Sequence, residues 1–113
     1  MRRLSLFLPI AAVLAAPAGL AADAAPSGKA VYEHWCAPCH APGPGHPGTQ
    51  SLQVKYGGRT PAVLLERKDL TPQAIAAFVR TGVLSMPPFR KTEVTDADLA
   101  ALSRYIADTA AGR

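Results

Sequence analysis

The sequence is poor in the large side chains that usually fill a protein core. Its 113 residues include one tryptophan, three tyrosines and three phenylalanines, so aromatic residues make up 6% of the chain. No stretch alternates polar and apolar residues with the two-residue period of a β-strand, and β-branched residues are scattered. We therefore expect one small all-α domain, whose interior needs a disulfide or a cofactor to make it stable.

Several function classes are disfavoured by patterns that the sequence lacks. No run of basic residues is interleaved with aromatic residues, which argues against nucleic-acid binding. No Ser/His/Asp set, no pair of carboxylates expected to be buried together and no glycine-rich phosphate loop is present. Nothing therefore indicates an enzyme with catalytic residues of its own. The formal net charge of +4 is too small to define a partner.

Residues 1–22 have the composition of a secretory signal peptide. Arg2 and Arg3 give a positively charged start, residues 4–20 are almost entirely apolar, and small residues follow. We expect cleavage between residues 21 and 24, which leaves residues 23–113 as the folded domain. An uncleaved membrane anchor is the alternative, but the apolar run is short and contains two prolines and a glycine. A bacterial protein exported in this way works in the periplasm.

The first half of the folded domain predicts one helix and one short helical segment. The helix runs from residue 29 to about residue 36, after a candidate N-cap at Ser27. Residues 41–48, A-P-G-P-G-H-P-G, predict a loop, and residues 51–59 are expected to be irregular. Residues 61–67 predict a short helix with proline in its first turn.

The second half predicts two longer helices. One begins after Thr71, which is a candidate N-cap followed by proline, and ends at Gly82. Residues 83–91, V-L-S-M-P-P-F-R-K, predict a loop because adjacent prolines do not continue a helix. The last helix begins at Thr95, with Asp98 completing a weak capping box. The domain is therefore expected to contain three main helices and one short helix.

The stretch H-W-C-A-P-C-H, residues 34–40, contains two overlapping motifs. W-C-x-P-C is typical of thioredoxin-like thiol–disulfide oxidoreductases, and C-x-x-C-H is typical of the site at which c-type cytochromes attach haem. A thioredoxin-like site follows an apolar strand in a mixed sheet, whereas here the preceding residues predict an amphipathic helix. The sequence therefore favours haem attachment.

In this hypothesis Cys36 and Cys39 bind one haem covalently, and His40 is the proximal ligand of the iron. Cysteines three residues apart near a helix end lie on one side, close enough to react with the two vinyl groups of one haem. A zinc site is less well supported, because no residue with suitable spacing supplies a fourth ligand. One haem c is therefore the expected cofactor.

Met86 is the best candidate for the second axial ligand. Besides the initiator it is the only methionine in the chain. It lies in a loop stiffened by two following prolines, where a flexible core filler is not expected. His34 adjoins the attachment motif and would not easily reach the opposite face of a haem, and His46 lies in a loop rich in proline and glycine. We therefore predict His40 and Met86 as the axial pair.

The chain resembles the small class I monohaem c-type cytochromes over nearly all of its folded domain. Gly28 and Tyr32 match the G-x-x-x-aromatic pattern of that family's first helix, and Leu102 and Tyr105 match the L-x-x-aromatic pattern of its last helix. C-A-P-C-H matches the attachment motif, and residues 82–87, G-V-L-S-M-P, match the loop of the methionine ligand. The resemblance implies the cytochrome c fold, with three main helices and a short one around one covalently bound haem.

One departure from the family pattern concerns the proximal imidazole. The family usually has a G-P pair after the attachment motif, and the backbone oxygen of its proline accepts a hydrogen bond from that imidazole. In this chain residues 45–48 read G-H-P-G. The resemblance implies Pro47 in this role, with Pro44 as the alternative. Such a bond fixes the ring and tunes the iron.

The expected function is electron transfer outside the cytoplasmic membrane. With both axial positions filled, the iron has no open site for a substrate and changes oxidation state without exchanging ligands. Lys55, Tyr56 and Arg59 are candidates for holding the haem propionates. Two other classes remain as alternatives: a haem enzyme or gas sensor with an open sixth position, and a thiol–disulfide oxidoreductase without haem.

A narrower resemblance indicates partner proteins. Residues 48–58 and 69–89 are similar to the cytochrome subunit of flavocytochromes that oxidise 4-alkylphenols, such as p-cresol methylhydroxylase and eugenol hydroxylase. This implies a flavoprotein subunit that supplies electrons singly, and a copper protein or another cytochrome that receives them. A freely diffusing carrier is the alternative. Arg90 and Lys91 are expected to form a solvated face or, alternatively, a docking patch for an acidic partner.

Overall fold

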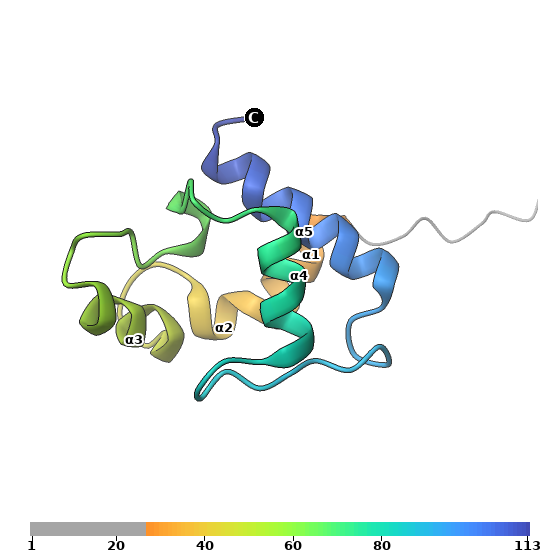
Figure 1. The fold of residues 1–113 in the computed structure, drawn as a ribbon, viewed down its shortest axis with the longest axis horizontal. Coiled ribbons are helices and arrows are strands. Elements are labelled where there is room, and N and C mark those ends of the chain that lie inside the picture. Colours follow the sequence, from red (N-terminus) through yellow and green to blue (C-terminus); the bar gives the residue numbers. More distant parts are fainter. Residues whose placement is uncertain (1–26) are drawn as a thin grey trace, which may run out of the picture.

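The computed structural model describes residues 27–113, so the predicted signal peptide lies outside the described part. These residues form an all-α fold, in which the described chain contains no strand and only an isolated bridge between Val83 and Met86. The elements in order are α1 (Gly28–Val31), a π-helical segment (Tyr32–Cys36), α2 (Ala37–His40), α3 (Pro47–Tyr56), a 3-10 helix (Leu64–Glu66), α4 (Pro72–Thr81) and α5 (Asp96–Ala110) (Figure 1). Across residues 27–113, no helix combines the length and apolar character that crossing a membrane requires.

The first helix is longer than expected. Its start is confirmed, because the Ser27 side chain accepts a hydrogen bond from the backbone N–H of Ala30 at 3.2 Å. Its predicted end at residue 36 is wrong, because the π-helical segment passes directly into α2, which ends at His40. Pro38 does not break this continuation; it lies in the first turn of α2, where proline is tolerated better than in a helix interior.

The closest contact between α1 and α5 lies at Gly28. A Cβ atom at this position would lie 2.2 Å from the backbone oxygen of Ala101 and 2.7 Å from Cβ of Tyr105. Only glycine fits this crossing, which explains the glycine of the G-x-x-x-aromatic pattern. The rings of Tyr32 and Tyr105 pack beside the contact with their centroids 5.7 Å apart. Residues of the two family patterns therefore meet at this crossing.

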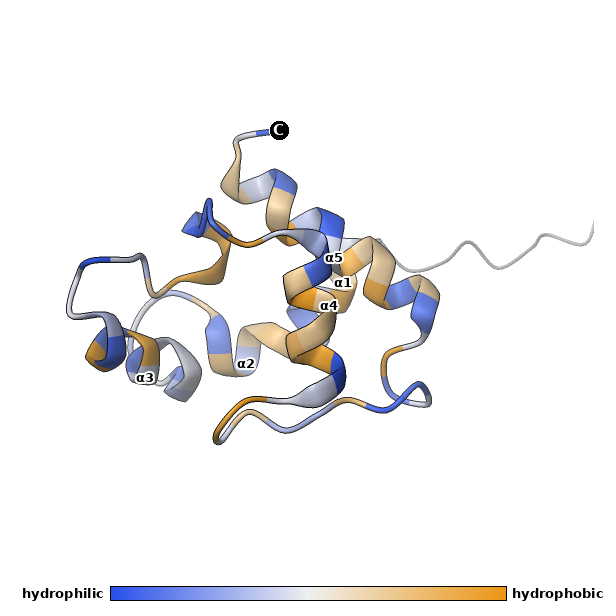
Figure 2. Ribbon diagram, viewed as in Figure 1, coloured by the Kyte–Doolittle hydropathy of each residue, from blue (hydrophilic) through white to orange (hydrophobic). Residues whose placement is uncertain are grey.

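The core lies where α1, α4 and α5 meet. Figure 2 shows apolar residues along these helices where they face one another. Helix α5 packs against α1, α4 and the 3-10 helix, and Leu102 is completely buried. The other buried core residues are Val31, Tyr32, Ile75, Val79, Val94, Leu99 and Ile106. Among the large apolar side chains of α4, Phe78 is the exception, because it remains 44% exposed.

Both ends of α4 and the start of α5 form as the sequence predicts. The Thr71 hydroxyl accepts from the backbone N–H of Ala74 at 3.1 Å, and Gly82 ends α4 with a φ of 68°. At the start of α5, Thr95 and Asp98 form the complete capping box, with each side chain accepting from the backbone N–H of the other residue.

The region between the attachment motif and α4 was predicted less well. Residues 51–59 were expected to be irregular, but residues up to Tyr56 belong to α3, which begins at Pro47 within the expected loop. Proline suits the first helical position, and Gly57 ends the helix in the left-handed conformation with a φ of 53°. The short helix expected over residues 61–67 is confined to three residues in 3-10 geometry.

Candidate functional site

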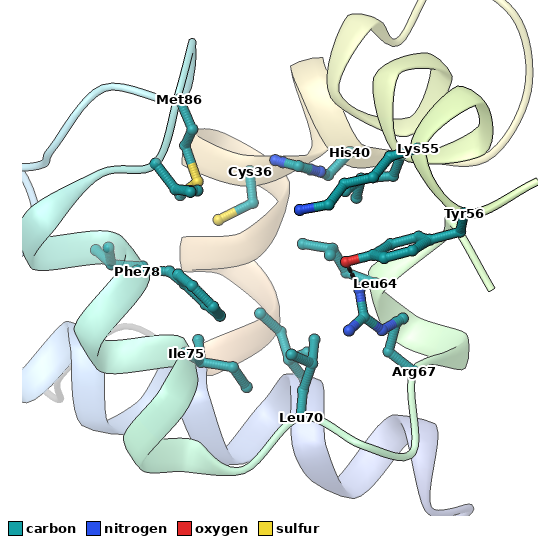
Figure 3. Close-up of a pocket in the computed structure, with 14 residues that line it drawn as sticks. Cys36, His40, Lys55, Tyr56, Leu64, Arg67, Leu70, Ile75, Phe78 and Met86 are labelled. Carbon is teal, nitrogen blue, oxygen red and sulfur yellow. Dashed lines mark hydrogen bonds between the residues drawn. The ribbon is translucent and has the colours of Figure 1, made fainter. Parts of the chain in front are cut away.

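One pocket brings together most of the predicted ligands. It lies between α2, α3, α4 and residues 82–89, which we call the Met86 loop (Figure 3). Its residues surround about 770 Å³ of space, part of which is open to solvent. The lining is mainly apolar and consists of Cys36, His40, Leu52, Lys55, Tyr56, Leu64, Arg67, Leu70, Ile75, Phe78, Val79, Val83, Met86 and Ile106.

His40 presents its imidazole to this pocket from the last residue of α2. Its Nδ1 atom is buried and has no hydrogen-bond partner among the described residues. Burial lowers the pKa of the His40 side chain, which favours the neutral imidazole that binds metals. A Cβ atom on Gly48 would lie 2.7 Å from Cε1 of His40, so the absent side chain makes room for the ring. This role of Gly48 was not predicted, because in the sequence it is simply a glycine that follows Pro47.

The two cysteines differ in their surroundings. Cys36 lines the pocket, and burial, followed by the neighbouring Cys39, raises the pKa of its thiol to about 11. Cys39 is exposed and is not among the residues that line the pocket. Both are free thiols in the structure. The sulfur of Cys36 and the ring of His40 therefore face the same space (Figure 3).

Met86 reaches the pocket from the other half of the chain. Its loop closes with two reciprocal backbone bonds, from Val83 N–H to Met86 oxygen at 3.0 Å and from Met86 N–H to Val83 oxygen at 2.9 Å. Leu84 occupies this turn with a φ of 51° and is 93% exposed. A Cβ atom on Gly82 would lie 2.6 Å from the backbone oxygen of Met86. The glycine of the G-x-x-x-M-P pattern is thus required by the path of the loop.

Pro47, His34 and His46 do not line the pocket. Pro47 is exposed at the start of α3, and no hydrogen bond joins it to His40 in the described chain, so its role stays a prediction. His34 packs against Trp35 with ring centroids 4.7 Å apart, and His46 lies with Nδ1 3.1 Å from the backbone oxygen of Pro38. Neither of these histidines lines the pocket.

Arg67 is a pocket residue that the sequence analysis missed. Its side chain is 9% exposed and donates two bonds to the carboxylate of Asp69, at 2.7 and 2.5 Å, and one to the Tyr56 hydroxyl at 3.1 Å. The hydrogen bond with Asp69 raises the pKa of Arg67 and lowers the pKa of Asp69. Lys55 and Tyr56 line the pocket as predicted candidates, whereas Arg59 lies at a separate surface depression. Residues 67–69 read R-K-D, a charged sequence typical of a protein surface, so nothing in the sequence distinguished Arg67 from its neighbours.

These residues fit a covalently attached haem. A neutral imidazole and a thioether sulfur are suitable ligands for low-spin haem iron, and a thiol stands beside them. Phe78 and Val83 are 44% and 43% exposed, which is unusual for large apolar side chains, and both belong to the pocket lining. A flat apolar group bound in this pocket would cover them. Arg67 and Lys55 also line the pocket and supply its positive charges.

An all-α domain whose C-x-x-C-H motif borders such a pocket is a c-type cytochrome with a single haem. Residues 23–106 match the family described as cytochrome C oxidase, cbb3-type, subunit III, and the chain belongs to this family. No curated protein and no solved structure gives a significant match. The family defines an electron-transfer protein with the cytochrome c fold and covalently bound haem c. The C-x-x-C-H interpretation is thereby supported over the thioredoxin-like one.

The first prediction concerns Gly82. Alanine at this position must adopt a backbone conformation that only glycine adopts readily, and its Cβ would collide with the Met86 and Pro88 backbones. We expect Gly82→Ala to lower the free energy of unfolding by roughly 2–4 kcal/mol. If Met86 binds the iron of a bound haem, the substitution should also weaken the sulfur–iron charge-transfer band of the oxidised protein.

Gly58→Ala is the matched control, because Gly58 also has a positive φ, of 80°, but nothing lies within 4 Å of its Cβ position. It should cost only about 1–2 kcal/mol and leave the band unchanged. Equal losses of stability and equal spectra in the two variants would show that the contact with the Met86 loop is unimportant.

Proposed function

We propose that this protein carries one electron at a time on a haem c held by Cys36, Cys39, His40 and Met86. The observation that carries the proposal is that Cys36, His40 and Met86 line one apolar pocket, although Met86 lies far from the other two in the sequence. In this proposal the two cysteine sulfurs form thioether bonds to the haem, and His40 and Met86 are the axial ligands of its iron.

The roles of these residues determine what the protein does. A haem supplies a one-electron couple, and thioether ligation by Met86 favours its reduced state. His40 and Met86 together leave no position for a substrate, so electron transfer fits the site better than haem catalysis or gas sensing. The apolar walls of the pocket exclude water, which limits the solvent rearrangement that accompanies a change of charge.

A hydrogen bond to a backbone carbonyl is proposed to fix the orientation of the His40 ring. We propose that its buried Nδ1 donates to the carbonyl oxygen of Pro47, with Pro44 as the alternative. The proposal is supported by the lack of another partner for Nδ1 and by the position of Gly48 against the ring. Such a bond would fix the imidazole plane and increase its basicity toward iron.

The haem carboxylates are assigned to the side of the pocket formed by Arg67, Tyr56 and Lys55. Arg67 is buried and already oriented by Asp69, so it loses little side-chain freedom when it binds an anion. Lys55 is exposed and lies with Nζ 5.6 Å from the centroid of the Tyr56 ring. Arg59 is dropped from this set because it does not line the pocket.

Arg67→Met tests this assignment through the reduction potential. A buried positive charge near the haem disfavours the ferric state, so its removal should lower the midpoint potential by roughly 60 mV, a tenfold change for one electron. Lys68→Met removes the same charge from an exposed neighbour outside the pocket and should have little effect. Equal shifts in the two variants would contradict a specific role for Arg67.

The spectrum of the exported protein tests the ligand set. We expect a haem that resists acid–organic extraction, and a sulfur–iron charge-transfer band in the oxidised protein that Met86→Ala abolishes. Carbon monoxide should bind the reduced Met86→Ala variant readily and the wild type poorly, because the variant has an open position on the iron.

A colourless protein with two titratable thiols would instead indicate the thiol–disulfide oxidoreductase. Rapid binding of carbon monoxide to the wild type would indicate the haem enzyme or sensor. Each outcome distinguishes the electron carrier from one of the alternatives.

The proposed location and partners of this protein rest on its sequence. We propose that residues 1–22 are a signal peptide, that residues 23–113 are the mature domain, and that this domain works in the periplasm. Electrons would come from a flavoprotein subunit and pass to a copper protein or another cytochrome. Support for a flavoprotein comes from the similarity of residues 48–58 and 69–89 to flavocytochrome subunits. A freely diffusing carrier is the second candidate.

Purification from the native host distinguishes a flavocytochrome subunit from a freely diffusing carrier. A subunit of a flavocytochrome should co-elute with a flavin-containing protein on size exclusion, and the haem should become reduced when a 4-alkylphenol is added. A free carrier should elute as an isolated small protein and remain oxidised under the same conditions. Replacing the 4-alkylphenol by an alkylbenzene without the hydroxyl group provides the matched control.

A further inference from the structure

We propose that Arg80 is a positioning residue that holds the Met86 loop against α4 and α5 and thereby retains Met86 at the pocket. The inference rests on the proposed role of Met86 as an axial ligand. It concerns a residue that neither lines the pocket nor belongs to the motif of the loop.

Arg80 contacts both ends of the segment that follows Met86. From the last turn of α4, its Nη1 donates to the backbone oxygen of Phe89 at 3.1 Å, and its Nη2 donates to Asp96 at 2.9 Å. Phe89 ends the Met86 loop, and Asp96 is the first residue of α5. The Arg80 side chain is only 22% exposed. One guanidinium therefore joins α4, the loop and α5.

The loop has few other means of attachment beyond Met86. Two prolines follow Met86 and have no backbone N–H to donate, so Phe89 is the first residue after it that can donate a backbone bond. Phe89 does so, to the Val79 oxygen at 2.8 Å, and its ring packs edge-on against Trp35 with centroids 5.8 Å apart. The bonds between Val83 and Met86 are internal to the loop and do not tie it to the helices.

The two bonds of Arg80 differ in their expected importance. The bond to the Phe89 oxygen is partly buried and has a charged donor, so its loss leaves a carbonyl without that partner. The pair with Asp96 is exposed at the carboxylate and is shared with Lys91, which donates to the same carboxylate at 2.8 Å. We therefore expect the contact with Phe89 to be the more important of the two.

Arg80→Met tests the proposal, because it keeps an unbranched side chain and removes both bonds. In the oxidised holoprotein the affinity for imidazole should rise roughly tenfold, which corresponds to about 1.4 kcal/mol, because imidazole competes with a less firmly held Met86. The sulfur–iron band should also be lost at a lower temperature than in the wild type. Arg80→Lys, which cannot form both bonds at once, should lie between the two.

Arg90→Met is the matched control. Arg90 lies just beyond the same loop, carries the same charge and is 80% exposed in a pair with Glu93. It should leave the imidazole affinity unchanged. If both variants bind imidazole like the wild type, or if Arg80→Met loses stability without any gain in imidazole affinity, the proposal is wrong. If Arg80→Met does not mature, the same comparison with Arg80→Lys decides it.

The wild type separates this inference from the function on which it rests. A wild type without a sulfur–iron band, whose spectrum Met86→Ala does not change, would overturn Met86 as the ligand and with it the role of Arg80. A wild type with the band, combined with unaltered Arg80 variants, would overturn the role of Arg80 alone.

Discussion

The contact between the backbones of α1 and α5 at Gly28 is the constraint on which the rest of the structure depends. It joins the two ends of the domain at a separation that permits no side chain. Because α1 continues through the π-helical segment into α2, this contact also sets the direction from which His40 enters the pocket. Because α5 also packs against α4, it places the helix from which the Met86 loop departs. One close crossing therefore relates two walls of the pocket that are distant in sequence.

The parts of the fold that follow local rules could be predicted from the sequence. Ser27, Thr71 and Thr95 cap helices as expected, because a short hydroxyl side chain before a helix satisfies free backbone donors whatever surrounds it. The predicted ligands Cys36, His40 and Met86 line one pocket, although their separation in the sequence gave no direct information on distance. The two family motifs supplied that information, because the residues that they identify are all expected to contact the same haem.

The features that were missed depend on contacts between distant residues. Helix α3 has no clear apolar face, with only Thr49 buried and Val54 86% exposed, so its periodicity gave no helical signal. The role of Gly48 is visible only when the His40 ring lies against it. Arg67 is buried through its bonds to Tyr56 and Asp69, and a sequence of charged residues gives no indication that one of them turns inward. Tertiary structure determined all three features.

The basic residues beside the Met86 loop are already matched with acidic ones. Arg80 and Lys91 share Asp96, and Arg90 pairs with Glu93, so three cations face two carboxylates and only one positive charge is left in excess. Long-range attraction between proteins acts through unpaired charge and is screened by salt. In the proposed periplasmic location, the carrier would meet an ionic strength that follows its surroundings. With so little unpaired charge beside the loop, the rate at which a redox partner reaches it should depend only weakly on salt.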